Sequence, residues 1–128
     1  MPRKTVVLGL GIALLSLLIG LGVFAYRSLK ERRFQAELEG VRQALVANRA
    51  NTALHKLNEL VARRPDIGEL YYLIGLCETL RGRPDRAEAA WEQIPPADAY
   101  HSGLAALHWA DLDRERGHLA DAEKRLAA

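Results

Sequence analysis

Cysteine, aromatic residues and net charge are all scarce in this 128-residue sequence. The one cysteine, Cys77, excludes an internal disulfide. A formal net charge of +2, with arginines interspersed among acidic residues, does not favour nucleic-acid binding. No run alternates between apolar and polar residues, so we expect no strand. Alanine, leucine, arginine and glutamate are plentiful instead, and this composition favours helices.

No catalytic or metal-ligand pattern is recognisable among the titratable residues. The histidines are scattered along the chain: His55, His101, His108 and His118. No two of them have the i, i+4 spacing of a helical metal pair, and we interpret them as ordinary surface or groove residues. Cys77 has no histidine near it in the sequence, and Glu78 beside it would not lower the pKa of the thiol. We therefore expect no catalytic residue, no metal and no cofactor.

Residues 5–26 form a long apolar run, TVVLGLGIALLSLLIGLGVFAY, without a charged side chain. As a helix rising about 1.5 Å per residue, this run spans roughly 33 Å and can cross a lipid bilayer. Residues 1–4 form a basic N-terminal flank, and residues 27–33 form a basic juxtamembrane segment. We interpret residues 5–26 as a transmembrane helix.

A cleaved secretory signal is the alternative interpretation, because Val23 and Ala25 would permit cleavage before Tyr26. Signal cores are typically about 7–15 residues long, which favours the uncleaved anchor. Small residues also recur on one side of this helix, where they would let two helices pack closely. These residues are Gly9, Ala13, Ser16 and Gly20. A homo-oligomer formed through the membrane helix is therefore possible.

Residues 68–94 have the pattern of two amphipathic helices joined by a tight turn. Gly82 can adopt the left-handed conformation that ends a helix, and Pro84 fits the first turn of the next one. On the inner face of the second helix, the small Ala87 is followed one turn later by the large Trp91. The pattern predicts a helical hairpin, which needs neighbours to bury its apolar stripe.

The pair of a small and a large residue recurs along the chain. It occurs 34 residues earlier as Ala53 and Leu57. It occurs again 35 residues later as Ala122 and Leu126. The expected turn residues align at the same spacing: Asn48, Gly82 and Gly117. With this period of about 34 residues, the chain resembles the tetratricopeptide repeat family, with Ile74-Gly75 at the position of that family's Leu-Gly pair.

The resemblance implies an all-α fold, in which the transmembrane helix precedes a short α-solenoid of about three helix hairpins. The expected repeats are residues 34–67, 68–102 and 103–128, and the last lacks a capping helix. The residues expected to pack the repeats together are Ala53, Leu57, Gly75, Ala87, Trp91, Ala122 and Leu126. The first helices of such repeats line a groove that binds peptides. The candidate groove residues are Gln35, Leu38, Arg42, Glu69, Tyr72, Leu76, Leu107, Asp111 and Arg114.

Helix ends and inward faces follow from the same pattern. We expect Asn51 or Thr52 to cap the helix over residues 52–64 and Asp98 to cap the helix that ends near Arg116. The residues expected inward before the turn at Gly82 are Leu70, Leu73, Ile74, Cys77 and Leu80. The apolar residues that the helix after Asp98 carries are Tyr100, Leu104, Leu107, Ala110 and Leu112. In the last helix we expect Leu119, Ala122 and Leu126 to form an apolar face that no capping helix covers.

These patterns together predict a single-pass membrane protein that binds a protein or peptide and acts as a scaffold or assembly factor, not as an enzyme. By family analogy it would lie in a bacterial inner membrane with its repeats outside the cytoplasm. Counting basic residues at the two ends of the helix favours the opposite orientation. Two alternatives remain. One is an N-terminal part of a longer repeat protein whose activity lies further on. The other is a secreted, soluble repeat protein released by cleavage.

If residues 5–26 span the bilayer, extraction of host membranes with alkaline carbonate should leave the full chain in the pellet. A peripheral protein from the same membranes serves as the control for effective stripping. The mature N-terminus is read in parallel, because a chain that begins at Tyr26 would show cleavage. Recovery of the full chain in the supernatant would contradict the anchor.

Overall fold

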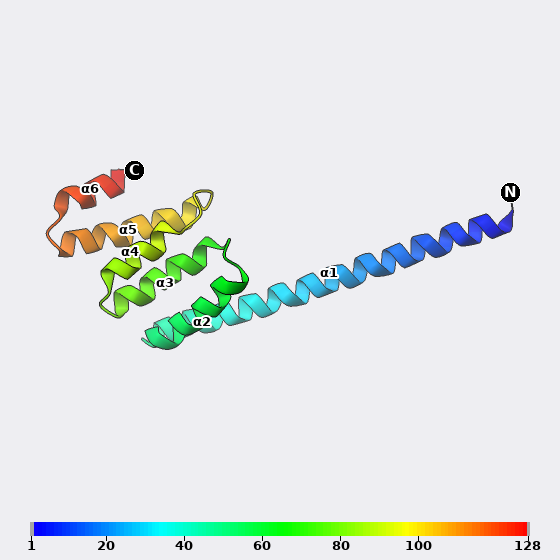
Figure 1. Ribbon diagram of the computed structural model, residues 1–128, viewed down its shortest axis with the longest axis horizontal. Helices are drawn as coiled ribbons and strands as arrows, with labels where there is room; N and C mark the ends of the chain where they lie inside the picture. Colours follow the sequence, from blue (N-terminus) through cyan, green and yellow to red (C-terminus); the bar gives the residue numbers. More distant parts are fainter. Residues whose placement is uncertain (1, 128) are drawn as a thin grey trace. The chain divides into compact units, whose positions relative to one another are not determined.

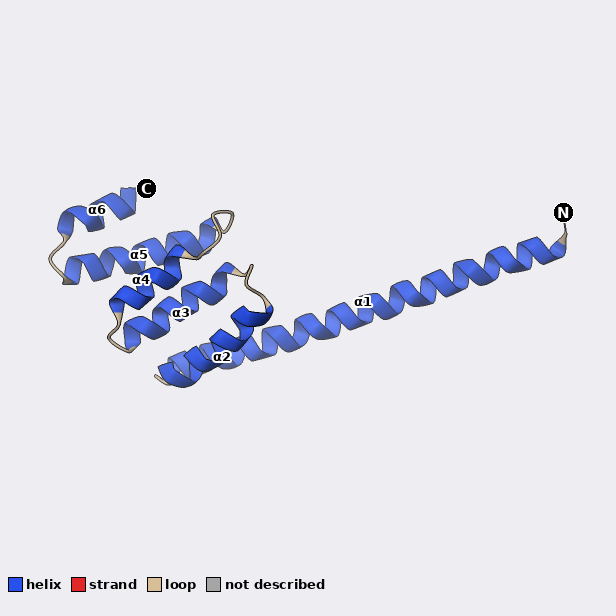
Figure 2. Ribbon diagram, viewed as in Figure 1, coloured by secondary structure: helices blue, strands red, loops and turns tan. Residues whose placement is uncertain are grey.

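The computed structural model describes residues 2–127, apart from the side chain of Leu119, and its regular structure over this range is entirely helical (Figure 2). The predicted all-α class is confirmed. The helices are α1 (Arg3–Val46), α2 (Ala50–Arg63), α3 (Gly68–Leu80), α4 (Pro84–Glu92), α5 (Ala99–Glu115) and α6 (Leu119–Ala127) (Figure 1). The chain divides into two compact units, Met1–Ala36 and Glu37–Ala128, and each is described by itself.

The first unit contains most of α1. One segment of α1 is long and apolar enough to cross a membrane, with a mean hydropathy of 2.6, and none of it is buried. The hydroxyl of Ser16 donates to the carbonyl of Ile12 at 2.9 Å, so this polar group is satisfied within the helix. No Pro-, Gly- or Ser-rich linker follows residue 33 in the sequence, and α1 continues without interruption to Val46.

In the second unit, successive helices pack against one another. Each helix from α2 to α6 contacts the next, and α3 also contacts α5. The turns after α1, α3 and α5 each contain a residue with positive φ: Asn48 at 58°, Gly82 at 71° and Gly117 at 78°. These are the three turn positions that the sequence predicted. Pro84 lies at the start of α4, also as predicted, where its missing N–H costs nothing.

A core cluster joins α3, α4 and α5. Its buried members are Tyr71, Ala87, Trp91, Ile94, Ala105 and Leu112. Gly75 makes this packing possible, because a Cβ at this position would lie 1.9 Å from Nε1 of Trp91. The indole N–H of Trp91 donates to the carbonyl of Tyr72 at 3.2 Å. The ring therefore lies directly on the backbone of α3.

The predicted small packing residues are all buried. Ala53 is 1% exposed, Ala87 0% and Ala122 5%. Their large partners differ, since Leu57 is fully buried but Leu126 is 52% exposed. The expectation that Leu126 packs inward is therefore wrong. The prediction for the side chain of Leu119 lies outside the described residues.

The N-termini of α5 and α2 are capped differently. Asp98 caps α5 as predicted, since its carboxylate accepts from the backbone N–H of His101 at 3.1 Å. Neither Asn51 nor Thr52 caps α2, which begins earlier, at Ala50, with Arg49 as its N-cap and no side-chain cap. The reason is that Asn48 turns the chain by itself, and the N–H of Arg49 bonds back to the carbonyl of Ala44 at 2.8 Å.

Several apolar residues of these helices are exposed, including Leu80, which the sequence predicted to face inward. Leu80 lies in the last turn of α3 and is 54% exposed, and Val46 at the end of α1 is 90% exposed. On α5, Tyr100 is 71% and Leu107 54% exposed, whereas Ala105, Ala110 and Leu112 are buried. Because α5 contacts α3, α4 and α6, its buried residues do not form the single stripe of a helix packed on one side. The helix also begins at Ala99, inside the range expected for the second repeat.

Replacing Gly75 with alanine should destabilise the second unit by about 1–3 kcal/mol, because the new methyl group would displace the ring of Trp91. Gly103→Ala on α5 is the matched control. A Cβ there has nothing within 4 Å, so the change should be neutral or stabilise by about 0.5–1 kcal/mol. Urea unfolding in detergent followed by tryptophan fluorescence reports on this unit, since both tryptophans lie in it. Equal stability of the two variants would contradict the close packing.

Candidate functional site

Arg42 connects the last turns of α1 to the first turn of α3. Its Nε donates to Oε1 of Glu69 at 3.1 Å, and its Nη1 lies 3.2 Å from Oε2 of Glu39. The hydrogen bond to Glu69 raises the pKa of Arg42 above its ordinary value. The side chain of Arg42 is 41% exposed and that of Glu69 24%, so solvent still reaches the pair. Two residues predicted for one groove are thus in direct contact.

Tyr72 connects α3 to α5. Its hydroxyl lies 3.0 Å from Nε2 of His108, and the centroids of the two rings are 5.8 Å apart. Burial raises the pKa of Tyr72, and Tyr100 contributes in the same direction. The ring of Trp91 stacks on His108 with centroids 6.2 Å apart. Half-buried Tyr72 is therefore held from both sides, by Trp91 under its backbone and by His108 at its hydroxyl.

Sequence reasoning missed the role of His108 as the partner of Tyr72. Their separation of 36 residues is close to the period of the repeat pattern, and this spacing is the signal that could have paired them. The residues around His108 in the sequence form no recognisable motif, however, so the spacing alone would not have identified the contact. The contact depends on α3 packing against α5.

Asp98 lies where α3 begins and α5 is capped. Its Oδ2 is 2.7 Å from Nδ1 of His101, and a Cβ on Gly68 would come within 2.1 Å of the same oxygen. Burial pushes the pKa of Asp98 up, but hydrogen bonds from the backbone and ring of His101 hold it below its ordinary value. The absence of a side chain at Gly68 therefore lets Asp98 approach α3.

The other predicted groove residues are placed differently. Leu38 is 1% exposed, so it packs in the core instead of facing solvent. Leu76 is half-buried beside the core cluster, while Leu107 is 54% exposed. Asp111 and Arg114 form an exposed ion pair at 2.7 Å on α5. Gln35 lies in the first unit, where its amide donates to Glu31 at 2.9 Å.

A second cluster holds α6 against α5. The Nε of Arg125 lies 2.6 Å from the buried carboxylate of Asp113, and its guanidinium lies 3.8 Å above the ring of Trp109. Beside them is a hollow of about 260 Å³, lined by Trp91, Ser102, Ala105, Ala106, Trp109 and Arg125. The indole nitrogen of Trp109 is buried and has no hydrogen-bond partner among the described residues.

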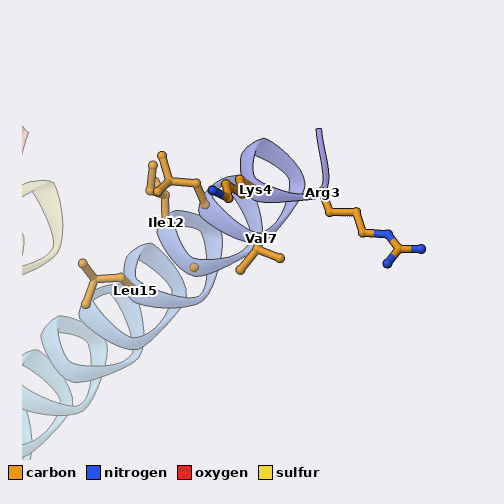
Figure 3. Close-up of a pocket in the computed structure, with 7 residues that line it drawn as sticks. Arg3, Lys4, Val7, Ile12 and Leu15 are labelled. Atoms are coloured by element: carbon orange, nitrogen blue, oxygen red, sulfur yellow. The ribbon is translucent and has the colours of Figure 1, made fainter. Parts of the chain in front are cut away.

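The hollow near the N-terminus is made by one helix only. Its lining residues all belong to α1: Arg3, Lys4, Val7, Leu8, Gly11, Ile12 and Leu15 (Figure 3). The small residues Gly9, Ala13, Ser16 and Gly20 lie on this same helix and are exposed. A Cβ added at Gly9 or Gly20 would meet nothing within 4 Å. This surface has the apolar character of a helix that contacts lipid, with two basic residues at its start.

Comparison with known proteins found no matching family model, no matching curated protein and no matching solved structure. Among residues 2–127, no group of three or more His, Cys, Asp or Glu side chains is arranged to hold a metal ion.

Cys77 should be unreactive in the folded protein. It is fully buried on α3, as predicted, and burial raises the pKa of its thiol from 9.0 to about 11. At pH 8, Ellman's reagent should label it only after denaturation, which serves as the positive control. Stability should also fall as the pH rises from about 9 to about 11, because the unfolded thiol ionises first. Rapid labelling of the native chain would contradict this burial.

Proposed function

We propose that this protein is a membrane-tethered scaffold or assembly factor that binds a protein or peptide and catalyses no reaction. Residues 5–26 would form the tether, in keeping with the exposed apolar segment of α1. The binding surface would be the α3–α5 face, defined here as Arg42, Glu69, Tyr72, Leu76 and Leu107.

The observation that carries this proposal is the pair of contacts that α3 makes through one of its sides. Glu69, Tyr72 and Leu76 are spaced by three and four residues, so they share a side of the helix. Glu69 binds Arg42 on α1, and Tyr72 contacts His108 on α5. Elements from three successive predicted repeats therefore contribute to one surface.

The chemistry of this face suits an amphipathic peptide, extended or helical. The ring of Tyr72 and the side chains of Leu76 and Leu107 offer apolar contact. The Arg42–Glu69 pair lies at one end, and further along α5 is the pair Asp111–Arg114. Exposed ion pairs contribute only about 0–1 kcal/mol, so a partner could exchange one at little cost.

We also propose that the second unit is a tetratricopeptide-like solenoid. Support comes from the positive-φ residues at all three expected turns and from the burial of Ala53, Ala87 and Ala122 at a spacing of 34–35 residues. By analogy with proteins of this layout, we place it at a bacterial inner membrane with its repeats outside the cytoplasm.

The test compares two equivalent substitutions. Leu107→Glu should abolish crosslinking-assisted co-purification of the native partner, because it places a charge within the α3–α5 face. Leu126→Glu is the matched control, since Leu126 is 52% exposed on α6 against 54% for Leu107. Tyr72→Ala combined with Arg42→Glu should give the same loss while the helicity by circular dichroism persists.

A purified partner must then bind the wild-type chain directly and lose affinity for the Leu107→Glu variant. Retention of the partner by both Leu107→Glu and the Tyr72–Arg42 double variant would place the interface elsewhere. Loss with the Leu126→Glu control as well would show that the effect is not specific to this face.

A further inference from the structure

We propose that a basic hollow at the helix turns of the second unit binds a carboxylate-rich segment of a partner protein. This turn hollow has a volume of about 560 Å³ and lies between the turn before α2 and the turn before α4. Its charged lining residues are Arg49, Arg81 and Arg83, and none of the described acidic residues lines it. It shares no residue with the α3–α5 face, so the inference stands apart from that proposed surface.

The turn hollow concentrates positive charge that the protein does not neutralise. Arg81 is paired with Glu78, whose carboxylate lies 3.0 Å from its Nη1. Arg49 and Arg83 have no carboxylate partner among the described residues, and both are exposed. The nearby Asp85 is occupied by Arg116 at 3.2 Å. Two guanidinium groups in this hollow therefore lack a counter-charge.

Their positions follow from the repeated turn. Arg49 follows Asn48 and Arg83 follows Gly82, and these preceding residues both have positive φ. Arg49 and Arg83 are thus the N-cap residues of α2 and α4, and no side chain caps either helix. The same local geometry, used twice 34 residues apart, directs two arginines to one hollow.

Charge and shape together select the occupant. Carboxylates on a partner would match the two unpaired guanidinium groups, which bind planar anions in a bidentate manner. The exposed side chain of Leu80 lines the same hollow as the arginines and offers apolar contact there. A recess of this kind fits the protruding side chains of a polypeptide better than it fits the broad surface of a lipid bilayer. We therefore infer a protein segment that carries Asp or Glu beside an apolar residue.

The experiment measures binding of a fluorescent oligoglutamate peptide with one central leucine to the full chain in zwitterionic detergent. Arg49→Glu and Arg83→Glu should each weaken binding at least about fivefold, since each replaces an attraction with a repulsion. Arg86→Glu is the matched control, because Arg86 is exposed, pairs with no described carboxylate and lies outside the turn hollow. It carries the same change in net charge and should leave the affinity within about twofold.

The peptide in which glutamine replaces glutamate should not bind, and added salt should weaken the acidic peptide. Circular dichroism checks that each variant is folded, and Arg49→Gln and Arg83→Gln provide milder versions with a smaller loss. An equal loss in all three glutamate variants, or no loss in any, would overturn the proposal. Tighter Arg49- and Arg83-dependent binding to phosphatidylglycerol vesicles than to the peptide would also overturn it, in favour of a lipid surface.

Discussion

The contact between Gly75 and Trp91 is the constraint on which the second unit depends most. A side chain at position 75 would occupy the space of the indole ring. With glycine there, Trp91 reaches the backbone of α3 and donates to the carbonyl of Tyr72. The same ring stacks on His108, so one close approach connects α3, α4 and α5. The hydroxyl of Tyr72 is thereby held where α5 can meet it.

The second unit has one surface region where charged side chains pair with each other and another where two arginines are unpaired among the described residues. On the α3–α5 face, Arg42 and Glu69 pair with each other, and the pair also joins two helices. Arg125 similarly binds the buried Asp113 and holds α6 on α5. Arg49 and Arg83, by contrast, are exposed, and no carboxylate in the described part of the chain pairs with them. Internal pairs hold helices together, whereas unpaired charges attract oppositely charged ligands, which is why we propose different partners for the two regions.

The two units differ in how their apolar side chains are kept from water. Its apolar side chains are exposed along the whole of residues 5–26, where a water-soluble domain would bury them. The bilayer supplies the missing apolar environment in our interpretation, and backbone hydrogen bonds within the helix satisfy its polar groups. In the second unit burial is internal instead, around small residues such as Ala53 and Ala87.

Local chemistry made several features readable from the sequence alone. The apolar run of α1, the helical class, the glycine turns, the cap at Asp98 and the burial of Ala53, Ala87 and Cys77 were predictable, because each depends on a residue type and its near neighbours. Two contacts of α3 were predicted to different degrees. Both partners of the Arg42–Glu69 contact were predicted groove residues, whereas only Tyr72 of the Tyr72–His108 contact was.

Only the tertiary structure decided which apolar residues of α5 and α6 are buried. Leu107 and Leu126 fit a helical stripe, yet both are exposed, while Ala105 and Asp113 are buried. A helix that packs on several neighbours has no single inner face, so the periodicity of its sequence does not identify the contacts. Helix packing also explains why Arg49 and Arg83 line one hollow. Sequence sets the chemistry of each arginine and the turn before it, but helix packing brings the two turns together.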